Sequence, residues 1–336
     1  MERICDDDAP ARYHISVRIL LPLIALALIA AACSGGGADP TPSPNPTPRP
    51  AASRTPRPTP SPTPSPSPTP EPTPAPVSID LSLSQAKQGG FLVVRLLSPP
   101  AGLESATVYF GGAGYKMFDA GDRWYRLIGL ETSTPVGGYP IEVDGPSGVV
   151  AAGTLTVTDG GFQYESIEIP PSSTDLLQDP AAVDAERATL NAIYAGFTPV
   201  KMWYGPWIMP AVGNISNAFG LQRSINGGAY YPHSGTDIAN EKGTPLVAAA
   251  SGTVVLARAM YLYGNVVVID HGLGVYTSYN HMDSIAVAEG QSVGQGDYLG
   301  AMGETGFVNG PHVHWEAIIS GVRTDPTLWT LGPVEP

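Results

Sequence analysis

The sequence predicts a mainly β protein, in which a small β-sandwich is followed by a second antiparallel β-sheet region with a groove, with one connecting helix between them. Three observations predict this class. Short apolar runs alternate with polar residues, glycine-rich turn clusters separate these runs, and the 336 residues include 39 glycines. Charged residues make up only 14% of the chain, against about 25% in a typical globular protein. A continuous coiled coil, an all-helical bundle and a many-span membrane protein are therefore excluded.

The first residues have the pattern of a secretory signal. Arg12 and Arg18 precede an apolar run at residues 19–32, which is too short for a comfortable bilayer span. Small residues end this run and Cys33 follows them directly, so residues 1–32 are expected to be a cleaved signal peptide. The cysteine at this place resembles a bacterial lipobox, which implies lipidation of Cys33. An uncleaved anchor helix is the alternative, and both place the rest of the chain outside the cytoplasm.

A proline-rich segment follows, and residues 33–77 are expected to form a tether. Seventeen of the 36 prolines lie between residues 40 and 76, mostly in Thr-Pro and Ser-Pro steps. Proline at every second position fixes φ and removes backbone donors, so the segment is either an extended polyproline II spacer or a plain disordered tail. The chain has two cysteines, and cleavage before Cys33 removes Cys5. No disulfide is then available, and the fold must depend on its core.

Residues 78–160 are expected to form a small, Ig-like β-sandwich. Apolar runs with strand character lie at residues 77–83, 91–97, 105–110, 124–130, 139–143 and 153–157. The segment has no Cys…Trp…Cys pattern, so it is not a true antibody-type domain. It also has no metal or nucleophile cluster, which favours a spacer or a module that contacts the cell wall.

Residues 161–200 are expected to be a connector with one helix. Asp179 suits the N-cap, Pro180 suits the first helical position and Gly196 suits the residue after the C-cap. The apolar residues between them fall on roughly one face: Val183, Leu190, Ile193 and Tyr194. Such a helix would pack on one of the β regions.

Charge excludes one class of partner. The chain carries 17 basic and 30 acidic side chains, which gives a net charge of -13. Binding to phosphates requires clustered lysine and arginine. We therefore expect no nucleic-acid partner. Separately, we expect the protein to be a monomer.

Five of the six histidines lie in the last third of the chain. His233 and Asp237 are four residues apart with glycine between them, and they could converge on one ion in a tight loop. His281 ends a strand-like run. His312 and His314 share one face of the next predicted strand because side chains alternate along a strand. Histidine nitrogen and aspartate oxygen are normal Zn²⁺ ligands, so these motifs together predict a metal site.

The same motifs resemble those of LytM/lysostaphin-type zinc peptidoglycan endopeptidases. The resemblance rests on His-Ser-Gly-Thr-Asp at 233–237, Tyr-Asn-His-Met at 279–282 and Gly-Pro-His-Val-His-Trp-Glu at 310–316. The flanking segments 217–220, 243–250, 264–272 and 290–296 agree in order. It implies a LytM-like zinc peptidase domain at residues 201–336 with an antiparallel β-sheet and a groove.

The resemblance also implies a role for each histidine of the site. His233, Asp237 and His314 would hold one Zn²⁺, and His281 and His312 would be the catalytic pair. His271 stands at a position that is usually structural. The implied activity is hydrolysis of peptide cross-links in peptidoglycan, by a protein lipid-anchored at the bacterial cell envelope. A non-catalytic LytM-like binder or activator of another hydrolase is the main alternative, and a structural wall protein is a third.

Overall fold

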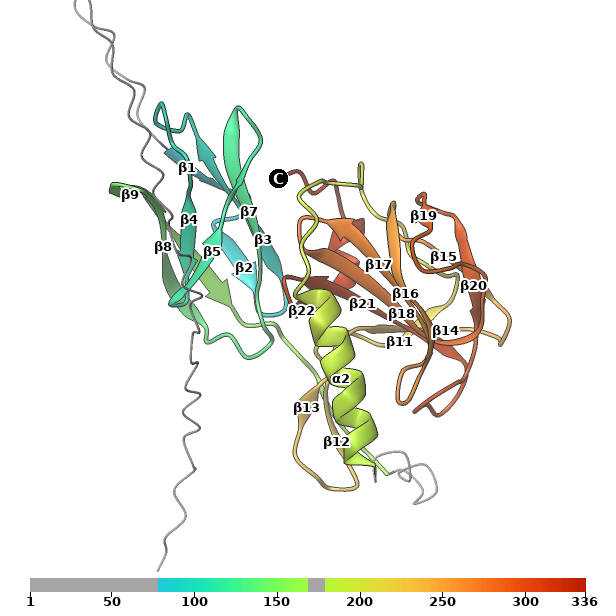
Figure 1. Cartoon of the computed structure of the whole chain (residues 1–336). Coiled ribbons are helices and arrows are strands. Elements are labelled where there is room, and N and C mark those ends of the chain that lie inside the picture. Colours follow the sequence, from blue (N-terminus) through green and yellow to red (C-terminus); the bar gives the residue numbers. More distant parts are fainter. Residues whose placement is uncertain (1–77, 169–178) are drawn as a thin grey trace, which may run out of the picture. The chain divides into compact units, whose positions relative to one another are not determined.

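The computed structural model describes residues 78–168 and 179–336, and these residues are mainly β (Figure 1). The expected signal peptide, the lipidation site at Cys33 and the tether lie outside the described residues. Within the described ranges, no helix has the length and hydropathy that a bilayer span needs.

Two sheets form the N-terminal β region, which we define as residues 78–158. One has the strand order β1-β3-β7-β6 and the other β2-β9-β8-β4-β5. The strands of the first are β1 Ser78–Leu81, β3 Phe91–Leu97, β6 Phe118–Asp119 and β7 Arg123–Gly129. Those of the second are β2 Gln85–Lys87, β4 Thr107–Phe110, β5 Ala113–Lys116, β8 Gly137–Gly145 and β9 Gly148–Thr158. Apolar side chains of both sheets share one core, as in a sandwich.

All six predicted runs of this region form strands. The sequence did not reveal the short strands β2, β5 and β6, which lack an alternating apolar pattern. The expected Ig-like character of the sandwich stays a prediction.

Strand β3 is buried on both of its faces. Leu92, Val94 and Leu96 point into the sandwich core. Val93 instead belongs to the core of the C-terminal β region, which we define as residues 164–168 and 179–336. A strand that is covered on both faces has a nearly continuous apolar sequence rather than an alternating one. The sequence of β3, Phe-Leu-Val-Val-Arg-Leu-Leu, fits this description.

The C-terminal β region contains a ten-stranded sheet with the main order β11-β14-β21-β18-β17-β16-β19. Three further strands, β15, β20 and β22, pair at its sides. The bounds are β11 Asn214–Asn217, β14 Thr236–Ala239, β15 Pro245–Val247, β16 Gly252–Met260, β17 Gly264–Gly272, β18 Val275–Ile285, β19 Ser292–Val293, β20 Tyr298–Met302, β21 His312–Ile319 and β22 Val322–Thr324. A short 3₁₀ helix, η2 Pro326–Thr330, follows the last strand. The expected antiparallel sheet is confirmed.

The predicted helix is present as α2, Pro180–Tyr194. The side chain of Asp179 accepts a hydrogen bond from the backbone N–H of Ala182, as expected of an N-cap. Leu190 and Tyr194 pack on apolar side chains of the large sheet. Gly196 has no left-handed backbone, but a Cβ there would lie 2.9 Å from the hydroxyl of Tyr276. This glycine therefore allows a close approach to the sheet.

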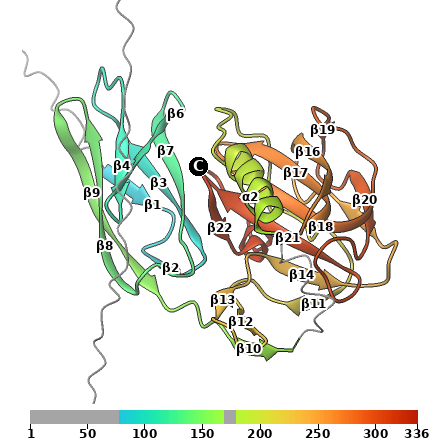
Figure 2. The same cartoon turned by 60° about the horizontal axis from the view of Figure 1, so that its bottom comes forward.

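A three-stranded sheet lies beside β11 and β14 (Figure 2). It consists of β10 Tyr164–Ile167, β12 Gln222–Ile225 and β13 Tyr231–Pro232. Strand β10 pairs in parallel with β12, and β12 pairs in antiparallel with β13. Part of the expected connector is therefore a strand of the C-terminal region.

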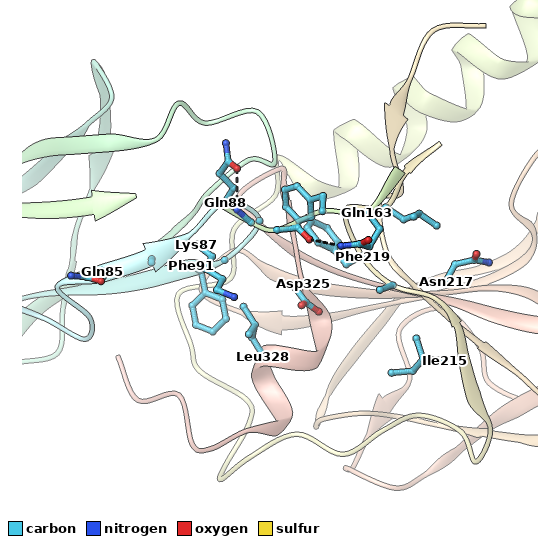
Figure 3. Close-up of a pocket in the computed structure, with 18 of the residues that line it drawn as sticks. Gln85, Lys87, Gln88, Phe91, Gln163, Ile215, Asn217, Phe219, Asp325 and Leu328 are labelled. Carbon is cyan, nitrogen blue, oxygen red and sulfur yellow. Dashed lines mark hydrogen bonds between the residues drawn. The ribbon is translucent and has the colours of Figure 1, made fainter. Parts of the chain in front are cut away.

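The two β regions contact each other through apolar side chains. Phe91 of β3 stacks on Trp329 with ring centroids 4.6 Å apart, and Leu127 of β7 joins the same core as Val93. The turn before β3 is also docked, because the carbonyl of Gly89 accepts a 2.7 Å hydrogen bond from the N–H of Asp325. A cavity of about 700 Å³ borders this contact (Figure 3). It contains none of the predicted metal or catalytic residues.

Candidate metal and catalytic site

Strand register brings the predicted site residues together. In the order β14-β21-β18, Asp237 pairs with His314, and His314 pairs with Asn280, the residue before His281. His312 lies two residues before His314 on β21, so the two share a face. All five predicted residues, His233 included, line one cavity.

His233, Asp237 and His314 form a compact group with metal-ligand character. Nε2 of His233 is 3.1 Å from Oδ1 of Asp237 and 3.0 Å from Nδ1 of His314. The same Oδ1 is 2.8 Å from Nδ1 of His314. Ligand atoms of a tetrahedral zinc site with bonds of about 2.0–2.1 Å lie about 3.3 Å apart. The three atoms therefore fit Zn²⁺ after small outward shifts.

Two of these side chains are oriented by a partner on the far side. The ring of His233 donates from Nδ1 to the carbonyl of Ala218 at 3.0 Å. The amide of Asn217 donates to Oδ2 of Asp237 at 2.9 Å. These bonds leave Nε2 of His233 and Oδ1 of Asp237 for a metal ion, which is how outer partners fix metal ligands in proteins.

The third side chain is held by a buried carboxylate. Nε2 of His314 lies 3.3 Å from Oε1 of Glu316, which also accepts from Ser234 at 2.7 Å and from Arg323 at 3.0 Å. Burial by itself raises the pKa of Glu316, but Arg323 and His314 outweigh burial and hold this pKa well below its usual range. An ionised Glu316 keeps the proton of His314 on Nε2 and leaves Nδ1 for the metal.

We expect Glu316→Gln to weaken metal binding about 10- to 100-fold, because it removes the charge that orients His314. The measurement is a zinc competition titration with a chelator of known affinity. Glu289→Gln, at an exposed carboxyl that does not line the cavity, is the control. Equal zinc affinity of wild type and Glu316→Gln would show that the carboxylate does not support the ligand.

His281 lies at a β-bulge. Asn265 of β17 pairs with Met282 of β18, and the next pair is Val267 with Tyr279. The register thus moves two residues along β17 but three along β18. Its φ of 64° is left-handed, which costs about 1–3 kcal/mol for a residue with a side chain. Bulges beside active sites re-aim a side chain, and here the bulge directs the imidazole of His281 into the cavity.

His281 and His312 face each other with ring centroids 5.0 Å apart. Nδ1 of His281 donates to the carbonyl of Thr305 at 2.9 Å, and Nδ1 of His312 donates to the carbonyl of Gly310 at 2.8 Å. A carbonyl oxygen can only accept, so each neutral ring carries its hydrogen on Nδ1 and has Nε2 as an acceptor. The pair is therefore arranged for proton transfer.

The charge states of two histidines differ for clear physical reasons. Burial, with charge on His314 and His312, lowers the pKa of His281 to about 3, so this ring is neutral at pH 7. Burial also lowers the pKa of His314, but the hydrogen bonds to Asp237 and Glu316 outweigh it and raise the pKa to about 9. A metal ion that binds Nδ1 of His314 would displace that proton.

The cavity has a volume of about 240 Å³. Its lining includes Arg223 and Ile225 of β12, Tyr231 of β13, and residues 307–309, which precede β21. His271 lies elsewhere. Its ring nitrogens contact the carbonyl of Ser251 and the hydroxyl of Thr277, both at 2.8 Å, which agrees with the structural position implied by the resemblance.

Sequence reasoning missed several supporting residues. Glu316 could have been found, since the alternation that places His312 and His314 on one face also places Glu316 there. Asn217 lay in a recognised flanking segment but had no assigned role. The carbonyls of Ala218 and Thr305 carry no sequence signal, because any residue supplies one.

Comparisons with known proteins agree with this geometry. Residues 231–326 match Peptidase family M23. The peptidoglycan DD-endopeptidase ShyA of Vibrio cholerae is 46% identical over 90 residues, which are 27% of this chain and 21% of that protein. The murein hydrolase activator NlpD of Salmonella dublin is 29% identical over 180 residues, which are 53% and 46% of the two chains. This chain thus covers less than half the length of either relative.

The similarity to solved structures extends over most of the chain. One of these is a crystal structure from Pseudomonas aeruginosa that is described as a peptidase M23, with 27% identity and a TM-score of 0.54. The match covers 72% of this chain and 93% of that chain. The similarity in fold is therefore not limited to the segment that carries the histidines.

Proposed function

Since residues 231–326 are a peptidase domain of family M23 and of the LytM type, we propose that this protein is a zinc-dependent endopeptidase acting on peptide cross-links of bacterial peptidoglycan. One observation carries the proposal: a two-histidine, one-carboxylate group lies beside a facing pair of histidines in a single cavity. The name of the relative ShyA, a peptidoglycan DD-endopeptidase, supports the substrate class.

His233, Asp237 and His314 would hold the zinc ion, which when bound acts as a Lewis acid and lowers the pKa of a water molecule. The chain has no His-Glu-x-x-His motif to supply a glutamate base. His281 and His312 must therefore accept the proton of the attacking water and pass a proton to the leaving amine. A protonated ring of this pair can also donate a hydrogen bond to the oxyanion.

The alternative is a LytM-like protein that binds or activates another hydrolase, as the name of the relative NlpD indicates for that protein. Such a protein does not need a complete site. Here all five positions carry a histidine or aspartate, and the three candidate ligands converge. The intact site favours the hydrolase.

The test combines zinc content with cleavage. We expect the purified chain to bind one zinc ion and to release cross-link fragments from peptidoglycan, as detected by mass. Asp237→Asn should lose both properties, since a neutral amide oxygen is a much weaker zinc ligand than a carboxylate. Zinc binding without cleavage would support the activator, and absence of zinc binding would contradict the proposal.

We further propose that the protein acts outside the cytoplasm as a lipid-anchored monomer. The sequence pattern of residues 1–33 supports lipidation at Cys33, and residues 33–77 would be the tether. In this proposal residues 78–160 are the Ig-like β-sandwich domain, residues 161–200 are the connector with a helix and residues 201–336 are the peptidase domain.

A further inference from the structure

One face of the three-stranded sheet β10-β12-β13 forms a wall of the catalytic cavity. Glu165 and Ile167 of β10 pair with Arg223 and Ile225 of β12, and Arg223 pairs with Tyr231 of β13. Paired residues on neighbouring strands share a face of the sheet. Four of the five line the cavity, and Glu165 is the exception. The wall is thus apolar apart from Arg223 and the tyrosine hydroxyl.

Arg223 is the only lysine or arginine among the described residues that line this cavity. Its ion-pair partner is Glu165, with Nε 3.4 Å from Oε2. Charge-assisted hydrogen bonds of this type are about 2.7–2.9 Å long. Both of these atoms are buried and have no hydrogen-bond partner within the described residues. Arg223 therefore lines the cavity while its Nε has no acceptor among the described residues.

The other arginine near the site makes the contrast clear. Nε of Arg323 donates to the fully buried Glu316 at 3.0 Å, and its NH2 group donates to the hydroxyl of Tyr263 at 3.3 Å. Arg323 does not line the cavity. One arginine is thus bound to a structural carboxylate, whereas Arg223 has only a long contact and faces the space where a substrate would lie.

We propose, on the basis of the proposed peptidase function, that Arg223 binds a free carboxylate of the substrate peptide. A planar guanidinium matches a carboxylate in a two-point contact, and the apolar neighbours Ile167 and Ile225 strengthen that contact by excluding water. The favoured substrate is then a cross-link in which a carboxylate lies beside the scissile amide. Direct cross-links through a diamino dicarboxylic acid have one, whereas a bridge of glycines does not.

The experiment uses two synthetic cross-linked peptides that differ in one group. The first has a free carboxylate beside the scissile amide, and the second has a carboxamide at the same position. For wild type we expect kcat/KM to be about 10- to 100-fold higher for the carboxylate peptide, which is the range for a hydrogen bond between charged groups. In Arg223→Gln this ratio should fall toward one, mainly through KM. Arg223→Lys should keep part of the preference, since it retains the charge without the fork.

A second variant tests the same idea without removing the arginine. Glu165→Gln takes away the carboxylate that competes for Arg223, so KM for the carboxylate peptide should fall while KM for the carboxamide peptide changes little. Equal cleavage of both peptides by wild type, or an equal loss on both in Arg223→Gln, would overturn the proposal.

If the zinc-loaded protein cleaves neither peptide, the proposed function is contradicted, but the role of Arg223 in binding can still be tested. In that case the two peptides are compared by equilibrium binding. A preference for the carboxylate peptide that Arg223→Gln abolishes would support the role of Arg223 as a binding residue, and equal affinities would overturn it.

Discussion

Replacing His312 with alanine is expected to lower kcat for cross-link cleavage by about 100- to 10,000-fold, the range for loss of a general acid–base group, while the protein keeps its zinc. Nε2 of His312 is 3.8 Å from Oδ1 of Asp237, farther than any distance among the three ligand atoms. The ring is therefore placed beside the metal group and not within it. The measurements are fragment release from peptidoglycan and zinc per chain.

His281→Asn is the matched variant for the other histidine of the pair. Asparagine tolerates the left-handed backbone of this position better than most residues, so the bulge should survive. If the two rings act as a unit, the double variant should lose no more activity than the stronger single one. Tyr298→Ala, at an exposed residue outside the cavity, is the control. Wild-type kcat in His312→Ala would remove it from catalysis, and loss of zinc would place it among the ligands.

Alternation along a strand predicted one part of this site, whereas the full set of five residues came from the resemblance to a known family. It placed His312 and His314 on one face, and β21 confirms that arrangement. The same alternation predicts that Glu316, two residues after His314, lies on that face as well. The capping residues Asp179 and Pro180 likewise predicted the start of α2 correctly. These features are local, so they can be read from a short stretch of sequence.

Features that depend on distant partners could not be predicted. The bulge at His281 is a difference in residue count between the paired strands β17 and β18. It depends on how the two strands align, so the sequence of one strand does not predict it. The pairing of β10 with β12 joins segments about 58 residues apart in register. This pairing places Arg223 of β12 in the wall of the cavity, a position that its local sequence does not indicate.

Removal of residues 78–158 is expected to destabilise the C-terminal β region by on the order of 5 kcal/mol. Phe91, Val93 and Leu127 are apolar side chains packed in or against its core, and each such side chain contributes about 1.5–3 kcal/mol when buried. Without them, the buried ring of Trp329 is exposed. A fragment that starts at residue 159, and so keeps β10, should melt on the order of 10 °C lower than the chain that retains residues 78–158. Its tryptophan emission should also shift to the red, because Trp203 and Trp207 pack on Trp329.

Removal of residues 78–158 should also weaken the metal site. The turn at Gly89 lies against the segment that contains Ala218, and Ala218 is a hydrogen-bond partner of the candidate ligand His233. Phe219 packs so closely on Gly89 that a Cβ on this glycine would lie 2.4 Å from its ring. Phe219 directly follows Ala218, whose carbonyl orients His233. Val93→Asp in the full chain should therefore lower both stability and zinc affinity. Leu97→Asp, at the exposed end of the same strand, should have a much smaller effect. Equal melting temperatures and zinc affinities for the fragment and the full chain would show that the N-terminal β region is only a spacer.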